Sequence, residues 1–152
     1  MVAPAAVDRD LQDVAGRYLA ARENAVSYTH PTPRSWLADV RAVMASAGWQ
    51  RLAASLGNDG GFPAATARAR RWSVRIIAVC RDNPDAGPAS STQAVLTCAV
   101  TDRTVDAAGR PVPARDLPGM WPYQGPQSPA LLALRRVNGR WLVDADETGR
   151  AS

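Results

Sequence analysis

Lysine is absent from this chain of 152 residues, and histidine occurs only once, as His30. The missing lysine excludes a Schiff-base lysine, a phosphate-loop lysine and a lysine general base. A single histidine excludes metal sites built from several histidines and mechanisms that need two. No apolar stretch approaches the roughly 20 residues of a membrane-spanning helix. The composition therefore excludes several kinds of catalysis and indicates none.

The residues that are present are typical of one globular domain. With 46% hydrophobic and 21% charged residues, the chain is neither disordered nor fibrous, and its length allows a single core. All 18 basic residues are arginine, and the net charge is +4. Such a charge favours anionic partners. The arginines are spread along the whole chain, however, and this distribution is more typical of an ordinary solvated surface than of a binding site for anions. We therefore expect no nucleic-acid partner. The arginine and alanine content suggests an actinobacterial type of source.

Helices are predicted for the first third of the chain. From Asp8, which can cap the first turn, apolar residues recur at helical spacing until the prolines that follow His30. A second helix is predicted from Thr32, as its cap, to Gly48, and a short third one over 49–56. The glycine-rich segment 57–61 has neither the preceding strand nor the following helix of a phosphate-binding loop, which predicts a flexible connector.

Strands are predicted after residue 71, where the apolar period changes to two. Strands are expected over 72–81 and 93–102, an irregular segment over 106–129, and a closing hairpin over 131–137 and 140–146 around Asn138 and Gly139. This order predicts an α+β fold in which N-terminal helices pack on one face of a strongly curved antiparallel sheet. We expect a single domain over 8–147, with a disordered or artificially added start (1–7) and a flexible tail (148–152).

The two cysteines, Cys80 and Cys98, fall on the apolar faces of the first two predicted strands. Antiparallel pairing could place them directly opposite each other, near disulfide distance. An oxidised pair would indicate an extracytoplasmic setting, whereas a reduced pair would act as two small core hydrophobes. The sequence leaves both alternatives open.

Other polar residues have weaker patterns. His30 would need Ser27 or Ser35 as a nucleophile, and nothing in the spacing supports that. Asp144 and Asp146 share a strand face, but the hairpin predicts that Arg135 and Arg140 neutralise them. We therefore assign no catalytic, cofactor-binding or metal-binding residue, and we expect no cofactor and no metal.

Further candidates lie near the ends of the predicted strands. Asp102 and Asp106 bracket the end of the second strand and are expected in its turn. A basic stripe is predicted along the first strand, where Trp72 reads as a core residue rather than a base-stacking platform. The members of this stripe are Arg68, Arg70, Arg71, Arg75 and Arg81.

Two aromatic residues, Trp121 and Tyr123, lie in a proline-stiffened segment. If they are exposed, they form a partner-docking patch with little ordering entropy to lose. If they fold back, they cover the open face of the sheet. Both alternatives are kept.

The order of elements resembles the nuclear transport factor 2-like superfamily, whose members form a cone. The closing segment Arg136–Asp144 is similar to the last hairpin of these domains. The arginine- and alanine-rich composition, with the segment Val95–Asp106, looks most like two actinobacterial extracytoplasmic groups. These are conjugative-transfer proteins related to the periplasmic component of type IV secretion systems, and mammalian-cell-entry-associated membrane proteins. Both groups normally follow one N-terminal membrane helix and act as assembly scaffolds without catalysis.

The resemblance implies an extracytoplasmic scaffold domain, held at the cell membrane by an anchor missing from this chain. Its partners would be further copies of itself and other envelope proteins. The alternative is a cone-fold isomerase- or cyclase-like enzyme, or a small-molecule binding protein, with Tyr18, Tyr28 or Asp102 in a pocket inside the sheet. A deep cavity with convergent ionisable groups would favour the alternative, and a filled interior would favour the scaffold.

Overall fold

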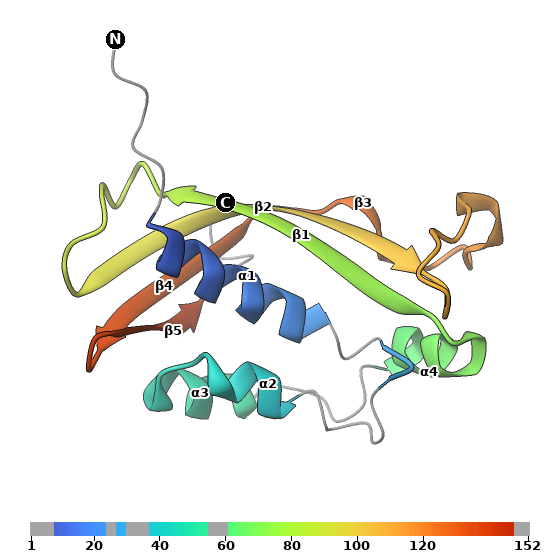
Figure 1. Cartoon of the computed structure of the whole chain (residues 1–152), viewed down its shortest axis with the longest axis horizontal. Helices are drawn as coiled ribbons and strands as arrows, with labels where there is room; N and C mark the ends of the chain where they lie inside the picture. Colours follow the sequence, from blue (N-terminus) through green and yellow to red (C-terminus); the bar gives the residue numbers. More distant parts are fainter. Residues whose placement is uncertain (1–7, 24–26, 30–36, 55–60, 148–152) are drawn as a thin grey trace, which may run out of the picture.

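A computed structural model describes residues 8–23, 27–29, 37–54 and 61–147 (Figure 1). The helices are α1 (Arg9–Glu23), α2 (Leu37–Ala42), α3 (Ser46–Ala53) and α4 (Gly61–Arg70), and a 3₁₀ turn, η2, spans Ala114–Asp116. The strands are β1 (Ser73–Asp82), β2 (Gln93–Val105), β3 (Gln124–Pro126), β4 (Ala130–Val137) and β5 (Arg140–Asp146).

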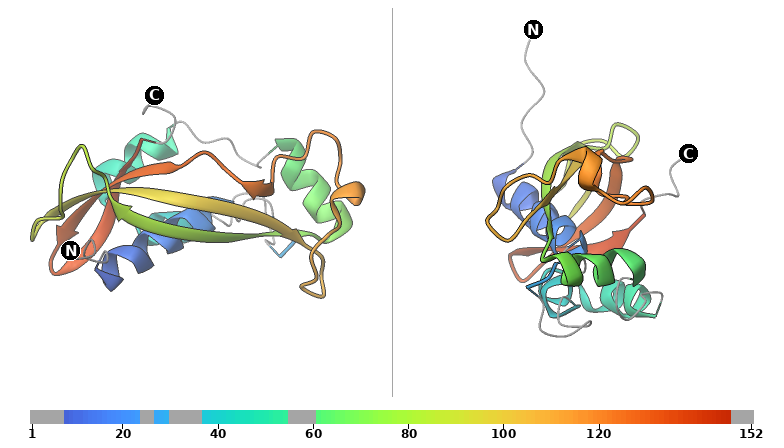
Figure 2. Two further views of the ribbon diagram at one scale, coloured as in Figure 1. Left: turned by 90° about the horizontal axis from the view of Figure 1, so that it is seen from above. Right: turned by 90° about the vertical axis from the view of Figure 1, so that its right-hand side faces the viewer.

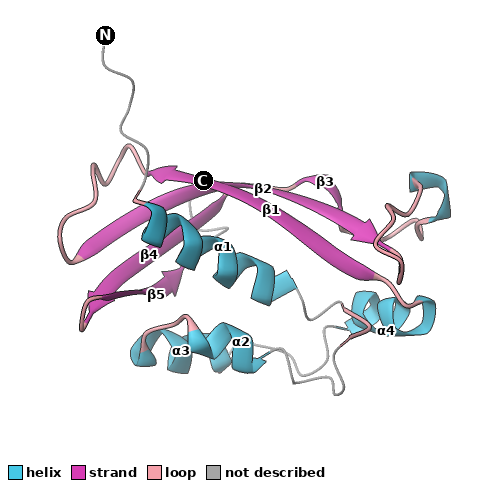
Figure 3. Ribbon diagram, viewed as in Figure 1, coloured by secondary structure: helices cyan, strands magenta, loops and turns pink. Residues whose placement is uncertain are grey.

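All strands belong to one antiparallel sheet in the order β1-β2-β4-β5, with β3 added beside β2. The sheet arches over the helices, which lie on its concave side, and the opposite face carries no helix of the described chain (Figures 1 and 2). Colouring by secondary structure shows the same division of helices and strands (Figure 3). The predicted α+β class with helices before an antiparallel sheet is confirmed.

Helix α1 fills the concave side of the sheet. Asp8 caps it as predicted, because its carboxylate accepts a hydrogen bond of 2.8 Å from the Asp10 backbone N–H. The helical spacing then places one apolar stripe against the strands. The buried members of this stripe are Leu11, Ala15, Tyr18, Leu19 and Ala21.

The prediction that Gly48 ends the second helix is wrong. The chain leaves helical geometry at Val43–Ala45, where two backbone hydrogen bonds of 2.8 Å join it to Val143 on β5. Gly48 instead lies buried inside α3, where a Cβ atom would overlap the carbonyl oxygen of Asp144. The glycine therefore allows a close approach of helix to strand, which local sequence does not distinguish from a helix end.

Helix α4 was not predicted, and it changes the basic stripe. Arg68 and Arg70 lie on α4 rather than on the first strand. Arg71 follows with φ of 59° and places its guanidinium 5.6 Å from the ring centre of Tyr28. Only Arg75 and Arg81 belong to β1. Of the predicted connector 57–61, Gly61 begins α4 and the other positions lie outside the described residues.

The alternation of β1 and β2 is confirmed, although β2 continues three residues beyond the predicted end. Every second side chain faces the core, while Ile77 and Val79 on the other face are 57% and 65% exposed. The hairpin prediction is also confirmed, because Asn138 and Gly139 have φ of 52° and 78° between β4 and β5.

Candidate functional site

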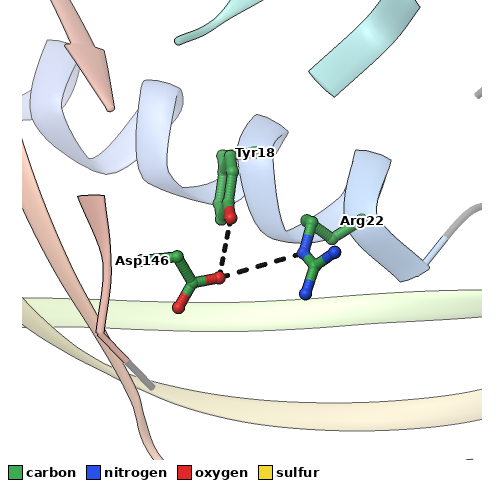
Figure 4. A network of polar contacts seen from close by, with 3 residues as sticks. All are labelled: Tyr18, Arg22 and Asp146. Atoms are coloured by element: carbon green, nitrogen blue, oxygen red, sulfur yellow. Dashed lines mark hydrogen bonds and ion pairs between the residues drawn. The ribbon is translucent and has the colours of Figure 1, made fainter. Parts of the chain in front are cut away.

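A polar cluster joins α1 to the end of β5. The hydroxyl of Tyr18 donates a hydrogen bond of 2.7 Å to Asp146 Oδ2, and Arg22 Nε lies 3.9 Å from the same oxygen (Figure 4). Tyr18 and Arg22 are four residues apart on the helix, so both side chains reach the same strand. The prediction that Arg135 and Arg140 neutralise the aspartates is wrong for Asp146, whose described ion pair is with Arg22.

Tyr18 is a structural donor in this cluster. Its side chain is completely buried, and burial, followed by the nearby Asp146 carboxylate, raises the pKa of the phenol far above its ordinary value. The phenol therefore stays protonated and its proton is directed at Asp146. Tyr18 was a pocket candidate, but the structure places it in the core behind the cavity wall.

A cavity of about 400 Å³ opens beside this cluster. Its walls come from the second half of α1, from α3, from β2, from the segment between β2 and β4, from the start of β4 and from the end of β5. Arg22, Asp102, Tyr123 and Asp146 contribute polar groups, and Leu19, Leu52 and Val100 contribute apolar surface. The cavity thus brings together ionisable groups from segments that are distant in sequence.

Asp102 is the most unusual group in this cavity. It lies within β2, opposite Ile76 on β1 and Gly125 on β3, rather than in the predicted turn. Only 2% of the residue is exposed, and its buried Oδ1 has no hydrogen-bond partner among the described residues. Burial raises the pKa of Asp102 to about 6. Asp106 does form the turn, since its carboxylate accepts hydrogen bonds from the backbone N–H groups of residues 108 and 110.

Tyr28 belongs to a different place in the fold. It borders a separate hollow with Ser73, Val74 and Arg75, near the open edge of β1. Its backbone N–H donates a 3.0 Å hydrogen bond to the Trp72 carbonyl. The three pocket candidates therefore do not form one site. Asp102 lines one cavity, Tyr28 lines another, and Tyr18 lies behind Asp146.

Trp121 and Tyr123 fold back onto the sheet. Trp121 is 2% exposed, and its ring lies edge-on to Trp72 at 5.4 Å and to Tyr123 at 5.7 Å. Its Nε1 donates a 2.6 Å hydrogen bond to Thr104 Oγ1. The alternative of an exposed docking patch is therefore wrong for Trp121. Tyr123 is half-buried and borders the Asp102 cavity.

Cys80 and Cys98 form a disulfide with an S–S distance of 2.04 Å. They are direct partners in the β1–β2 register, as one of the two alternatives predicted, and both are buried against α1. This bond joins the two longest strands at the centre of the core.

The remaining candidates have structural surroundings or are not described. Ser27 is buried, with its hydroxyl 2.6 Å from Thr29 Oγ1 and 3.0 Å from Ser73 Oγ. His30 and Ser35 lie outside the described residues. Within the described part of the chain, no group of three or more potential metal ligands is found.

Sequence reasoning missed Arg22 as the partner of Asp146 and missed the amide of Gln12, which contacts the edge of β1. Helical spacing does place Arg22 on the stripe that begins at Leu11. Its partner could not be found that way, because it lies on the last strand and only the packed sheet brings the two together.

Comparison with known proteins leaves the family open. No protein-family model matches the chain, and no curated protein matches it. None of the described helices is both long enough and apolar enough to cross a membrane.

Proposed function

We propose that this chain is a non-enzymatic extracytoplasmic scaffold domain of a bacterial cell-envelope transfer system. The system would be related to conjugation and type IV secretion, or to the mammalian-cell-entry-associated proteins, and the fold would be the nuclear transport factor 2-like cone. The domain would be held at the membrane by an anchor, and it would bind further copies of itself and other envelope proteins.

The disulfide carries this proposal. Structural disulfides form and persist in oxidising compartments and are rare in the cytosol of mesophiles. Cys80 and Cys98 are buried, lie opposite each other in register and join the edge strand β1 to its neighbour β2. A buried bond of this kind stabilises a fold rather than performing redox exchange, which needs an accessible thiolate.

The contacts of Asp146 support a role without catalysis. Its carboxylate is engaged by Tyr18 and Arg22, so these three side chains stabilise one another, although Arg22 and Asp146 also border the cavity. Ser27 has hydroxyl neighbours and no histidine, carboxylate or amine among its described hydrogen-bond partners. No activated nucleophile is therefore formed by the described side chains.

A second candidate function rests on Asp102. Its buried carboxyl group has a pKa of about 6 and one oxygen that no group of the described chain hydrogen-bonds, so it can accept a proton near neutral pH or pair with a cationic ligand. The cavity beside it would then hold the small molecule of an isomerase- or cyclase-like enzyme or of a binding protein.

One experiment separates the two functions. The gene is deleted in the cell that encodes it and replaced by the wild type, by Asp102→Asn or by the pair Cys80→Ala and Cys98→Ala, and transfer of DNA to recipient cells is counted. The scaffold proposal expects lost transfer on deletion, full recovery with Asp102→Asn and reduced recovery without the disulfide.

Two outcomes would contradict the scaffold proposal. Undiminished transfer of DNA after deletion would exclude a role in a conjugative transfer system. If Asp102→Asn does not restore transfer, although its protein level is normal and its melting temperature is at least that of the wild type, the cavity function is favoured. Asp85→Asn, at an exposed position outside the cavity, is the matched control.

A further inference from the structure

The convex face of the sheet carries an exposed patch with charge of one sign. We define the convex patch as Arg75, Ile77, Val79 and Arg81 on β1 with Thr101 and Arg103 on β2. All six residues are exposed, and the helices of the described chain lie on the other side of the sheet (Figures 1 and 2). Apolar side chains therefore lie at its centre and arginines at both ends.

Two arginines of the patch face each other across the strands. Arg75 and Arg103 are direct partners in the antiparallel register. Like charges directly opposite each other destabilise a sheet. Within the described residues, no carboxylate lies within ion-pair distance of either guanidinium. The Arg75 guanidinium extends toward residue 109 and borders the hollow that Tyr28 lines, and either guanidinium would stabilise an anion bound beside it.

The neighbouring strand positions add no negative charge. The outward-facing positions of β2 from Gln93 to Arg103 and of β4 from Leu131 to Val137 contain no acidic residue. A second copy docked through the same face would therefore bring arginines against arginines, which disfavours self-association here. Charge complementarity requires an anionic partner.

We propose that the convex patch binds the surface of an anionic phospholipid membrane. Guanidinium groups match phosphate geometry bidentately, and Ile77 and Val79, at 57% and 65% exposure, can enter the headgroup boundary between them. The patch has no aromatic side chain of the kind that anchors protein interfaces. This inference goes beyond the proposed scaffold role.

The test is binding of the purified chain to vesicles. Vesicles of phosphatidylcholine with about one third phosphatidylglycerol are compared with pure phosphatidylcholine by co-sedimentation, at low and high salt. The wild type is expected to bind the anionic vesicles, and added salt is expected to weaken binding. Arg75→Gln with Arg103→Gln is expected to bind about 25-fold more weakly, since each basic residue near such a surface contributes roughly fivefold.

Two further variants make the result specific. Ile77→Thr with Val79→Thr keeps the charge and the β-branched shape, and it is expected to lower binding at least about fivefold with an unchanged melting temperature. Arg17→Gln with Arg68→Gln removes the same charge from exposed positions on the helices and is expected to leave binding within about twofold. No binding of the wild type, or an equal loss in the helix control, would overturn the proposal. Because no transfer assay is involved, this result is independent of the scaffold proposal.

Discussion

The side chain of Gln12 on α1 accepts a hydrogen bond of 2.8 Å from the backbone N–H of Cys80, 68 residues further along the chain. Its Nε2 donates a second bond of 3.1 Å to the Ala78 carbonyl. One amide thus occupies two backbone groups at the open edge of β1, as a neighbouring strand would. Unpaired edge groups invite association with other chains, and a helix side chain here covers two of them.

Replacing Gln12 with methionine should destabilise the protein. The variant keeps the length of the side chain and its helix propensity but leaves two backbone groups at the edge of β1 without partners. We expect the free energy of unfolding in urea to fall by about 1–3 kcal/mol. Gln50→Met, at an exposed position of α3, is the matched control and should change it by less than about 0.5 kcal/mol. Equal effects of the two variants would contradict this account.

Two glycines inside helices should respond to alanine with opposite signs. At Gly48 the added methyl group would overlap the backbone of Asp144, so α3 and β5 must separate, and we expect a loss of at least about 2 kcal/mol. At Gly16 the nearest atom would be 3.8 Å from the new Cβ, so better helix propensity should raise stability by about 0.5–1 kcal/mol. Melting temperatures that move in the same direction would contradict the packing of α3 on β5.

Asp102 should make stability fall as pH rises. The folded protein holds the proton of this carboxyl up to its pKa of about 6, whereas the unfolded chain releases it near the ordinary value of about 4. Between these values the folded state binds more protons, so the free energy of unfolding decreases with pH, by at most about 3 kcal/mol. The stability that the protonated Asp102 carboxyl contributes is fully present below about pH 4 and is lost above about pH 6.

The Asp102→Asn variant should lack this dependence. Its free energy of unfolding should exceed that of the wild type above pH 7, while the advantage disappears near pH 4. Urea titrations at several pH values measure the free energy of unfolding of the variant and of the wild type. Asp85→Asn, at an exposed position, should keep the profile of the wild type. A wild-type profile in the Asp102 variant would show that this carboxyl is not the group responsible.

Reduction should lower stability through the bond between Cys80 and Cys98. The bond closes a loop with a sequence separation of 18, for which the chain-entropy relation gives about 3 kcal/mol. We expect a lower melting temperature in dithiothreitol, and an oxidised mass two hydrogens below that of the reduced chain. The pair Cys80→Ala and Cys98→Ala should melt near the reduced wild type and show no response to reductant. If the chain has its fully reduced mass without added reductant, the disulfide is not formed.

Local patterns were sufficient for most of the secondary structure. The stripe of α1, the alternation of β1 and β2, and the turn at Asn138 and Gly139 follow from side-chain period and backbone preference, which act between near neighbours. Helix α4 was missed because its sequence has little apolar periodicity, and Gly48 was misread because a glycine at a close contact looks locally like a helix end.

The site depended on packing. The sequence by itself determined that β-period strands follow helices, that each cysteine faces the core and that most chemistry based on lysine and histidine is excluded. Only the tertiary structure decided that Cys80 meets Cys98, that Arg22 and Tyr18 meet Asp146, and that Asp102 is buried with one oxygen left without a partner in the described part of the chain. Strand register and helix docking set these contacts, and both are fixed by the free energy of burying the whole core at once, to which every segment contributes.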